Sequence, residues 1–381
     1  MSDNLREPIL TKDGVRIASR PETVARKWQA RASAAWKTIV KRYKEIIPPY
    51  HRRKVRYGAL LTLTGAIVSV QAFFHNPAPL TVYFYDIGQG DGFHIRTAAG
   101  FDVLVDGGPH DTIVEKLGRT LPFWDRTIEL MIATHADADH ITGQIAVLRR
   151  FEVKRVLSTG VVHTTDEYLE WLSTIKEKGV PVEIVKTGGR YELASPPANG
   201  PADTRALVPY LQVLWPDKDW SGKRPQEIEG DLNMNDTSIV ARLTFGEVSF
   251  LFTGDAEEGV EEQLVQKYDA NMRMLCQSTN TNSQFADLHE ICRLTSQLSA
   301  DVLKVGHHGS KTSSSKEFLR AVSPKYAVIQ SGRKNRFGHP HFAVLWRLKQ
   351  VGAQVLRNDQ DGGIIFETDG TTLQYRVKGV R

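Results

Sequence analysis

Cysteine is scarce in this sequence, which contains only Cys276 and Cys292 among 381 residues. Two cysteines this far apart cannot supply a cysteine-type zinc site or a disulfide framework, so a metal bound here must use histidine and carboxylate ligands. The glycine-spaced loop 88–92 lacks both the Gly-x-Gly-x-x-Gly spacing and a following helix, which argues against a nucleotide cofactor. Disorder and fibrous repeats are also excluded, because 41% of the residues are hydrophobic and 24% are charged.

The main part of the chain lacks an excess of positive charge, although the whole has a formal net charge of +5. Lys and Arg outnumber Asp and Glu by 15 to 5 in residues 1–56, whereas residues 57–381 hold 34 against 39. A basic arm therefore precedes a mildly acidic body, which argues against a broad nucleic-acid-coating surface over that body. A local basic patch is still expected to hold phosphates, and it comprises Lys304, Lys311, Arg333, Lys334 and Arg336.

One long apolar run is present, at residues 57–74, and it contains no charged side chain. As a helix these 18 residues would measure about 27 Å, just enough to span a bilayer. We expect an uncleaved transmembrane helix; a buried core helix, a cleaved signal peptide and a twin-arginine export signal are the alternatives. Residues 41–56 hold seven Lys or Arg, whereas residues 75–100 hold only Arg96. This asymmetry predicts a single-pass protein of the cell inner membrane, with the N-terminus in the cytoplasm and the body on the periplasmic side.

The basic arm has a helical pattern of its own. Apolar residues recur every three or four positions in residues 22–47, with Lys and Arg between them. This predicts a basic amphipathic helix, which either lies on the anionic inner leaflet or forms the solvated face of a small helical hairpin. The expected organisation is therefore a cytoplasmic arm at 1–56, a transmembrane helix at 57–74 and a catalytic body at 80–381.

The body alternates apolar, strand-like runs with turns and helical patterns, and its second half repeats the order of the first. Two such halves predict an α/β fold in which two sheets pack face to face with helices outside, a four-layer αββα (α+β) sandwich. Residues 271–299 are polar and lack a strand pattern, so we expect an inserted loop or helix there. Residues 195–204 predict a surface loop rich in Pro and Gly.

The sharpest chemical signal is the segment from Thr134 to His140, which follows an apolar strand and precedes a helix. Alternate residues of an extended segment point to the same side, and the turn into the helix brings later side chains back toward them. Two histidines and two aspartates in one such turn predict a loop that serves metal ions. The four side chains are His135, Asp137, Asp139 and His140.

This pattern, His-x-Asp-x-Asp-His, resembles the His-x-His-x-Asp-His signature of the metallo-β-lactamase superfamily, with Asp137 in place of the second histidine. Further motifs follow in order, so that roughly residues 80–380 resemble the hydrolase domain at the C-terminus of ComEC-type DNA-uptake proteins. Such proteins also carry a many-helix channel, which a chain with one predicted span cannot build. The supporting motifs are Asp86–Gly92, Leu104–Gly108, Asn235–Ser238, Phe252–Asp255, Leu303–Ser310 and Gly338–Pro340.

The resemblance implies two divalent metal ions, zinc or manganese, with Asp255 bridging them. One ion would use His135 and Asp137 beside Asp255. The other would use Asp139, His140, Asp255 and His307. The histidine that the family usually places between the first metal loop and Asp255 has no match here, which leaves one position short of a ligand. The many carboxylates favour harder ions such as manganese more than a three-histidine zinc site does.

The expected function is that of a membrane-anchored phosphodiesterase, with nucleic acid among the candidate substrates and a metal-bound hydroxide as the nucleophile. Asp139 would also orient or deprotonate the attacking water, His308 or His339 would stabilise the departing oxygen, and Lys304 would steer phosphate. Two alternatives remain open at this stage. One is a hydrolase of lactams, lactones or thioesters on the same fold, and the other is a membrane-tethered binding module without catalysis.

Overall fold

The computed structural model of the chain divides into two compact units, residues 1–76 and 77–381. It describes residues 80–193, 208–229, 232–278 and 297–379, together with Lys37, Thr38, Lys41, Arg42, Tyr57, Thr62 and Thr64. The predicted amphipathic helix, the transmembrane segment 57–74 and the loop 195–204 therefore lie wholly or largely outside the described residues. Among those that are described, no helix is both long enough and apolar enough to cross a membrane.

The second unit contains two large β-sheets. The first sheet has the order β17-β16-β1-β2-β3-β5-β7-β8. Its strands are β1 (Leu80–Phe84), β2 (Phe93–Arg96), β3 (Asp102–Val105), β5 (Leu130–Ile132), β7 (Val156–Ser158), β8 (Val182–Ile184), β16 (Ile364–Thr368) and β17 (Leu373–Val377). A separate two-stranded ladder pairs β4 (Thr127–Ile128) with β6 (Glu152–Val153).

The second sheet has the order β15-β14-β13-β12-β11-β10-β9. Its strands are β9 (Arg190–Glu192), β10 (Tyr210–Trp215), β11 (Val240–Phe245), β12 (Val248–Phe252), β13 (Val302–Lys304), β14 (Tyr326–Ile329) and β15 (Gln354–Arg357). Each sheet is parallel at one end, β3-β5-β7-β8 in the first and β12 to β15 in the second, and antiparallel elsewhere.

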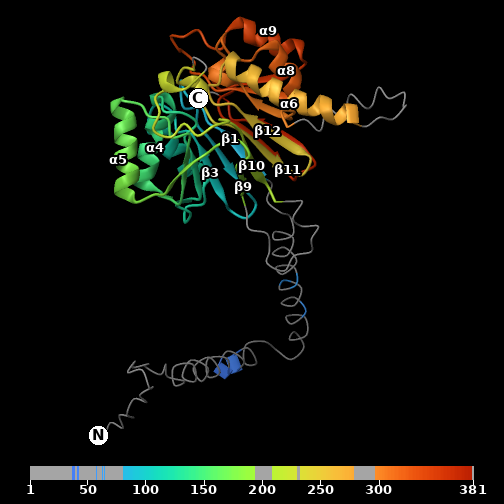
Figure 1. The fold of residues 1–381 in the computed structure, drawn as a ribbon. Coiled ribbons are helices and arrows are strands. Elements are labelled where there is room, and N and C mark those ends of the chain that lie inside the picture. Colours follow the sequence, from blue (N-terminus) through green and yellow to red (C-terminus); the bar gives the residue numbers. More distant parts are fainter. Residues whose placement is uncertain are drawn as a thin grey trace, which may run out of the picture. The chain divides into compact units, whose positions relative to one another are not determined.

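Helices cover the outer faces of both sheets, as Figure 1 shows. Over the first sheet lie α3 (Thr112–Thr120), α4 (Ala138–Arg150) and α5 (Asp166–Lys178), which share one buried cluster with that sheet. Over the second lie α6 (Glu258–Ser278), α8 (Lys316–Val322) and α9 (Phe342–Gln350), and a short helix α10 (Asn358–Asp361) follows β15. Local sequence sets these limits: the Thr165 side chain accepts a hydrogen bond from the Tyr168 N–H at the start of α5, and Gly179 ends it at a φ of 65°.

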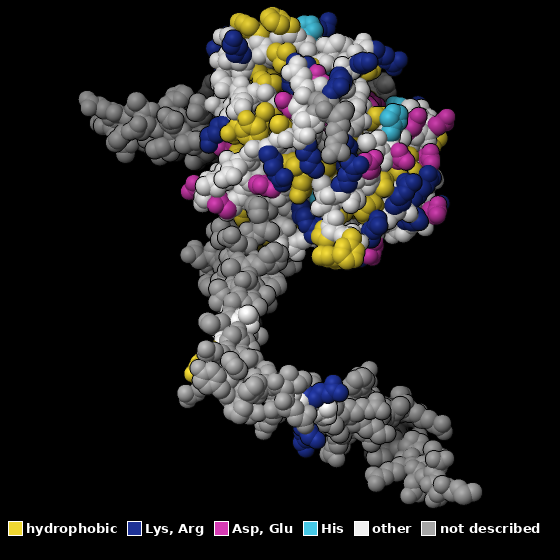
Figure 2. Space-filling model, turned by 180° about the vertical axis from the view of Figure 1, so that it is seen from behind, with side chains coloured by type: hydrophobic (Ala, Val, Ile, Leu, Met, Phe, Trp, Pro, Cys, Tyr) yellow, Lys and Arg dark blue, Asp and Glu magenta, His cyan; other side chains and the backbone are white. Residues whose placement is uncertain are grey.

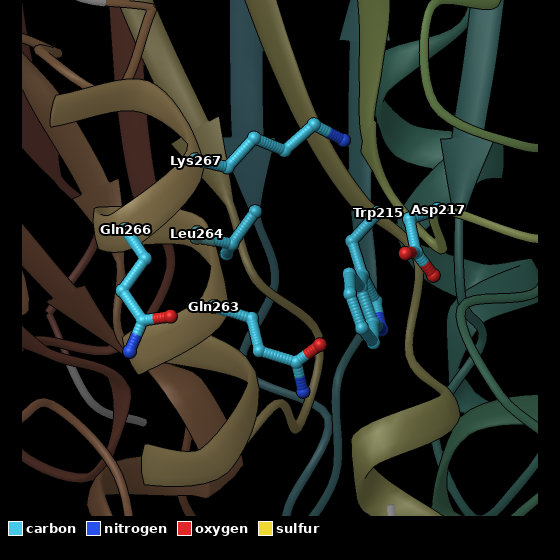
Figure 3. Close-up of a pocket in the computed structure, with 6 residues that line it drawn as sticks. All are labelled: Trp215, Asp217, Gln263, Leu264, Gln266 and Lys267. Atoms are coloured by element: carbon cyan, nitrogen blue, oxygen red, sulfur yellow. The ribbon is translucent and has the colours of Figure 1, made fainter. Parts of the chain in front are cut away.

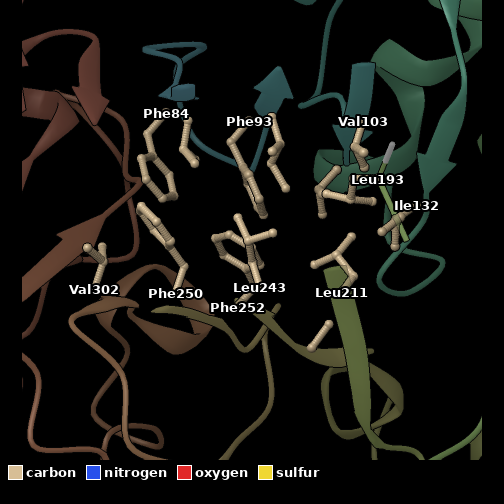
Figure 4. Close-up of a cluster of buried hydrophobic side chains, with 14 of the residues drawn as sticks. Phe84, Phe93, Val103, Ile132, Leu193, Leu211, Leu243, Phe250, Phe252 and Val302 are labelled. Atoms are coloured by element: carbon tan, nitrogen blue, oxygen red, sulfur yellow. The ribbon is translucent and has the colours of Figure 1, made fainter. Parts of the chain in front are cut away.

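The two sheets face each other across an apolar core that Figure 4 shows in close-up. Phe84, Phe93 and Val103 of the first sheet pack toward Leu243 and Phe252 of the second, and all are buried. The four-layer arrangement predicted from the sequence is therefore present. The halves are not separate, however, because β1 pairs with the C-terminal strand β16, Leu80 opposite Thr368. The segment predicted as a polar insertion begins as helix, since α6 continues to Ser278.

Candidate metal centre

Three loops bring polar side chains to one edge of the paired sheets. The first loop, residues 134–140, follows β5, and the second, residues 253–255, follows β12. The third is a tight turn of 3-10 type, η4 (Gly306–Gly309), which follows β13. Because β12 and β13 are parallel, their C-terminal ends lie at the same edge of the second sheet, and the contact of His140 with Asp255 brings the loop after β5 of the first sheet beside them. Sites of open α/β sheets form at such edges.

Nitrogen and oxygen atoms converge there without hydrogen-bond partners. Within the described part of the chain, the buried Nε2 atoms of His135, His140 and His308 have no hydrogen-bond partner. Asp255 Oδ2 lies 3.4 Å from His140 Nε2 and 3.2 Å from His308 Nε2. His308 Nε2 is also 3.3 Å from Asp139 Oδ2. Buried polar atoms are normally satisfied, so this convergence of unpaired nitrogens beside carboxylates fits a bound cation.

The other ring nitrogen of each imidazole, Nδ1, has a hydrogen-bonding partner. His140 Nδ1 donates to Asp106 Oδ2 at 2.8 Å, and His308 Nδ1 donates to the Gln330 carbonyl at 3.0 Å. His135 Nδ1 lies 3.1 Å from Thr134 Oγ1 and 3.3 Å from Ser238 Oγ. A proton on Nδ1 leaves the lone pair of Nε2 free for a metal, and such outer hydrogen bonds orient metal ligands in general.

The electrostatic field at the convergence point favours positive charge. Burial alone would lower the pKa values of His140 and His308, but Asp255, helped by Asp106 or Asp91, holds both well above 6.5. Burial would likewise raise the pKa of Asp255, yet His308 and His140 hold it well below 3.8. A divalent cation at this point would stabilise the same carboxylates that otherwise favour protonated imidazoles.

A buried ion pair lies directly beneath this point. Lys304, the last residue of β13, is fully buried and forms an ion pair with Asp91, whose side chain is also fully buried. The ammonium group donates a 2.8 Å hydrogen bond to the Gly254 carbonyl and lies 3.6 Å from Asp255 Oδ1. The sequence predicts a place for Lys304 in a local basic patch that holds phosphates. The structure differs, because this side chain has no exposed surface from which to reach a phosphate.

The adjacent histidines of η4 point to different partners. His307 was predicted to bind metal, but its Nδ1 lies 2.8 Å from Glu257 Oε1 and 3.4 Å from Asn235 Nδ2. His308, predicted to face the leaving group, instead joins Asp139 and His140 in a group whose ligand atoms lie within 4.8 Å of one another. Both histidines have positive φ values, 43° and 52°, a strained conformation that turns their side chains apart.

The other predicted ligands divide in the same way. His135, His140 and Asp255 form a second group within 4.8 Å, so four predicted ligands and His308 come together. Asp137 belongs to none of the ligand groups found among the described residues, and its Oδ2 lies 3.6 Å from His135 Nε2. Its side chain keeps a relative exposure of 34%. The structure therefore places Asp137 at the rim of the centre.

His339 lies beside the pair of histidines, on a loop that follows β14. Its ring centroid is 5.4 Å from that of His307 and 6.4 Å from that of His308. Burial and the neighbouring His307 and His308 lower its pKa to about 4, so the ring is neutral near pH 7. Asn335 fixes the loop, since its Oδ1 accepts the His339 N–H at 2.9 Å and its Nδ2 donates to the His339 carbonyl.

A cavity of about 410 Å³ opens beside the centre. Asp139 contributes one wall, and Arg336 and Phe337, from the loop that carries His339, contribute another. The guanidinium of Arg336 lies 5.2 Å from the centroid of the Phe337 ring. Gln89 belongs to the lining as well, and its Oε1 accepts the Gly332 N–H at 3.1 Å, which ties this loop to the segment between β1 and β2.

Another cavity lies away from the predicted chemistry. It has a volume of about 360 Å³ and lies between the end of β10 and helix α6, as Figure 3 shows. Its lining comprises Trp215, Asp217, Gln263, Leu264, Gln266 and Lys267. None of these belongs to the ligand groups described above, so the cavity beside Asp139 is the candidate substrate site.

Comparison with known families assigns the fold and the centre to a class. Residues 88–333 match the family described as the metallo-beta-lactamase superfamily, and the chain belongs to it. This confirms the resemblance seen in the sequence, and it identifies the chain as a metal-dependent hydrolase by class.

Two curated relatives are similar to this chain over most of its length. The chain is 30% identical to ComE operon protein 3 of Bacillus subtilis (strain 168) over 262 residues, 66% of this chain and 25% of that protein. It is 29% identical to competence protein ComA of Neisseria gonorrhoeae over 316 residues, 82% of this chain and 36% of that protein. The chain thus spans between a quarter and about a third of the length of these relatives.

Solved structures show more distant similarities. The metallo-beta-lactamase fold protein YhfI from Bacillus subtilis matches with a TM-score of 0.42 and 11% identity, over 76% of this chain and 99% of that one. Zn(2+)-bound PqqB from Methylobacterium extorquens matches with a TM-score of 0.39 and 10% identity, over 71% of this chain and 85% of that one. Neither similarity bears on the substrate of this chain.

Proposed function

We propose that the protein is a divalent-metal-dependent phosphodiesterase. The observation that supports this proposal most directly is the cavity beside the centre, where Asp139 faces a loop bearing Arg336 and Phe337. Arg333 and Lys334 of the same loop are exposed. Cationic side chains next to a metal centre complement an anionic substrate such as a phosphodiester.

The residues of the chain divide the work between holding the ion and handling the substrate. Asp139, His140, Asp255 and His308 would hold a divalent ion, with His135 and Asp137 at the rim available to a second. A divalent ion supplies Lewis-acid stabilisation of charge that develops on the phosphoryl oxygens and activates water for attack.

The substrate is handled by groups around the cavity. The Asp139 side chain, 36% exposed, is the ligand carboxylate open to solvent and would orient the attacking water. Arg336 would hold a phosphate oxygen, and the neutral His339 imidazole would donate a hydrogen bond to the departing oxygen. Phe337, with 55% of its surface exposed, offers a face on which a base can stack.

Nucleic acid is the substrate class that we propose for this site. Two relatives are named as a competence protein and a ComE operon protein, and a third is recombination protein 2 of Haemophilus influenzae, 51% identical over 55 residues, 14% of this chain and 7% of that protein. Contact with phosphates would be local, because Lys and Arg side chains lie scattered among acidic and apolar ones on the face in Figure 2. A local contact predicts a shallow salt dependence of substrate binding.

We also propose that residues 57–74 anchor the enzyme in the inner membrane with its hydrolase unit on the periplasmic side. The support comes from the sequence, an uncharged run preceded by seven basic residues in 41–56. Protease added to intact spheroplasts should digest a C-terminal tag on the full chain. Full protection of the tag would contradict this topology.

Activity on a phosphodiester is the decisive test of the proposed function. The purified full chain, loaded with Mn²⁺ or Zn²⁺, should hydrolyse bis-p-nitrophenyl phosphate and single-stranded DNA but not a chromogenic cephalosporin. His308→Ala should lower kcat by more than about 100-fold, the upper end of what outer-sphere substitutions cost, because it removes a ligand rather than an orienting group.

His163→Ala is the matched control, since His163 forms hydrogen bonds with Thr165 before α5 and belongs to none of the ligand groups among the described residues, so kcat should stay unchanged. A chain that opens a lactone or lactam but cleaves neither phosphodiester would replace the proposal with the alternative hydrolase. Near wild-type phosphodiesterase activity in His308→Ala would contradict the ligand assignment.

A further inference from the structure

The ammonium group of Lys304 lies at the centre, and its side chain has no exposed surface. The side chain is fully buried, and its Nζ contacts Asp91 and the Gly254 carbonyl. Burying an ammonium is costly unless an opposite charge lies beside it, so the pair with Asp91 is a condition for this placement. Asp91, Asp255 and His308 form a ligand group around the same point, with ligand atoms within 4.8 Å of one another.

The two carboxylate oxygens of Asp255 have different neighbours. The inner oxygen, Oδ1, lies 3.6 Å from the Lys304 ammonium. The outer oxygen, Oδ2, lies 3.4 Å from His140 Nε2 and 3.2 Å from His308 Nε2. A carboxylate that bridges two metal ions through both oxygens would need Oδ1 to be free of the lysine. Only Oδ2 therefore faces the imidazoles.

His140 imposes a second limit on the number of ions. The group that contains His135 and the group that joins His308 to Asp139 both include His140. An imidazole nitrogen has one lone pair and binds one metal ion. When His140 binds the ion shared with Asp139, His308 and Asp255, His135 keeps only Asp137, at 3.6 Å, as a carboxylate of its own. His135 and Asp137 are thus the two ligands that this position would not share with the first ion, fewer than the three or four of protein zinc sites.

We propose that Lys304 is a built-in cation of this centre, which neutralises Asp91 and the inner oxygen of Asp255 so that the chain binds one divalent ion tightly. The tight ion lies among Asp139, His140, Asp255 and His308. A second ion, at His135 and Asp137, binds at least about 100-fold more weakly, because it lacks two ligands of the first position. This inference rests on the metal centre of the proposed function but not on its substrate.

Metal stoichiometry of the full chain tests the proposal without any activity measurement. The metal-free protein is titrated with Mn²⁺ and with Zn²⁺ by calorimetry, and the ion retained after gel filtration is counted by elemental analysis. We expect one retained equivalent in the wild type. Two equivalents whose dissociation constants differ by less than about 100-fold would overturn the proposal.

Removal of the Lys304 side chain should increase the number of metal ions that the protein retains. Lys304→Ala empties the ammonium position and leaves Asp91 and Asp255 without a fixed cation, so a second equivalent should be retained. Adding Asp91→Asn to Lys304→Ala removes one of the two carboxylates and should return the retained metal to one equivalent. A folded Lys304→Ala protein that still retains one equivalent would overturn the proposal.

If Lys304→Ala does not fold, the wild-type stoichiometry still decides. Lys304→Met combined with Asp91→Asn removes both charges at nearly constant volume, and it should fold and retain one equivalent. Retention of two by this pair would overturn the assignment of Asp91 to the inner position. A chain that retains one ion yet cleaves no phosphodiester would keep this inference and reject the proposed function.

Discussion

Asp106 supports the centre without touching its ligand atoms, and the substitution Asp106→Asn tests that support. The residue follows β3, is fully buried and adopts a φ of 54°. Its Oδ1 accepts the Thr134 N–H at 2.9 Å, and its Oδ2 accepts the Thr134 hydroxyl at 2.7 Å and His140 Nδ1 at 2.8 Å. Three donors thus converge on one carboxylate. The amide nitrogen of an asparagine is itself a donor, so it cannot accept a hydrogen bond from any of them.

The magnitude follows from the donors that asparagine cannot satisfy. If its oxygen replaces Oδ2, its amide group faces the Thr134 N–H, and one hydrogen bond to a charged acceptor, about 1.5–3 kcal/mol, is lost. The two remaining bonds become neutral and about half as strong. We therefore expect a loss of roughly 2–4 kcal/mol in the free energy of unfolding. Metal affinity should fall about 10–100-fold, because His140 is held less firmly.

Urea unfolding followed by circular dichroism measures the stability, and competition with a chelator measures the metal affinity. Asp125→Asn is the matched control, because Asp125 forms a 3.2 Å ion pair with Arg96 in which both side chains are 20% exposed. Its loss should cost less than about 1 kcal/mol and leave metal affinity unchanged. If Asp106→Asn binds metal as the wild type does, Asp106 does not orient His140 and the reasoning is refuted.

Two further predictions concern the packing of glycines and the protonation of a buried carboxyl group. Gly143→Ala would place a Cβ 1.9 Å from the Gly107 carbonyl oxygen, so it should destabilise the fold by about 1–3 kcal/mol or more in urea unfolding. Gly118→Ala is the control, because no atom lies within 4 Å of its new Cβ, and it should stabilise α3 by up to about 1 kcal/mol. Equal unfolding midpoints for the two variants would contradict the packing argument. Burial raises the pKa of Glu261 to about 7, so the folded state keeps a proton that the unfolded chain, with a pKa near 4.5, has lost. The contribution of Glu261 to the free energy of unfolding should therefore fall by about 3 kcal/mol as the pH rises from 4.5 through 7. Thermal melts at pH 5 and pH 8 measure this change, and Glu261→Gln should remove that part of the pH dependence. An identical pH dependence in both proteins would refute the prediction.

Local signals in the sequence located many elements of this fold. Helix α5 has the limits 166–178 because a capping threonine precedes it and Gly179 follows it, and both are start and stop signals that the sequence displays. The strands at 354–357 and 364–368 are apolar runs between turns and also match. The edge strand β17 was missed, since four of its five side chains are exposed and give no apolar run. The pairing of β16 with β1 joins residues nearly 290 positions apart, Leu80 with Thr368, and no local pattern encodes it.

The site was predictable in its residue types but not in its geometry. The sequence identified the loop that carries His135 and His140 because ligand side chains crowd one turn. It could not tell which of His307 and His308 faces the centre, since both lie between glycines and both adopt positive φ values. The structure distinguishes them through partners far along the chain, Glu257 for one and the Gln330 carbonyl for the other. The burial of Lys304 depends equally on Asp91, from a loop of the other sheet.

The centre therefore depends on side chains from both sheets at once. Ser238, at the start of β11, accepts the Asp255 N–H at 2.9 Å and lies 3.3 Å from His135 Nδ1. One hydroxyl thus fixes a ligand from each sheet relative to the other. Metal ligands must be positioned within a few tenths of an ångström, and buried hydrogen bonds of this kind provide that positioning. The motif from Asn235 to Ser238 consequently acts on the centre by orienting its ligands, although none of its side chains is among the atoms that converge there.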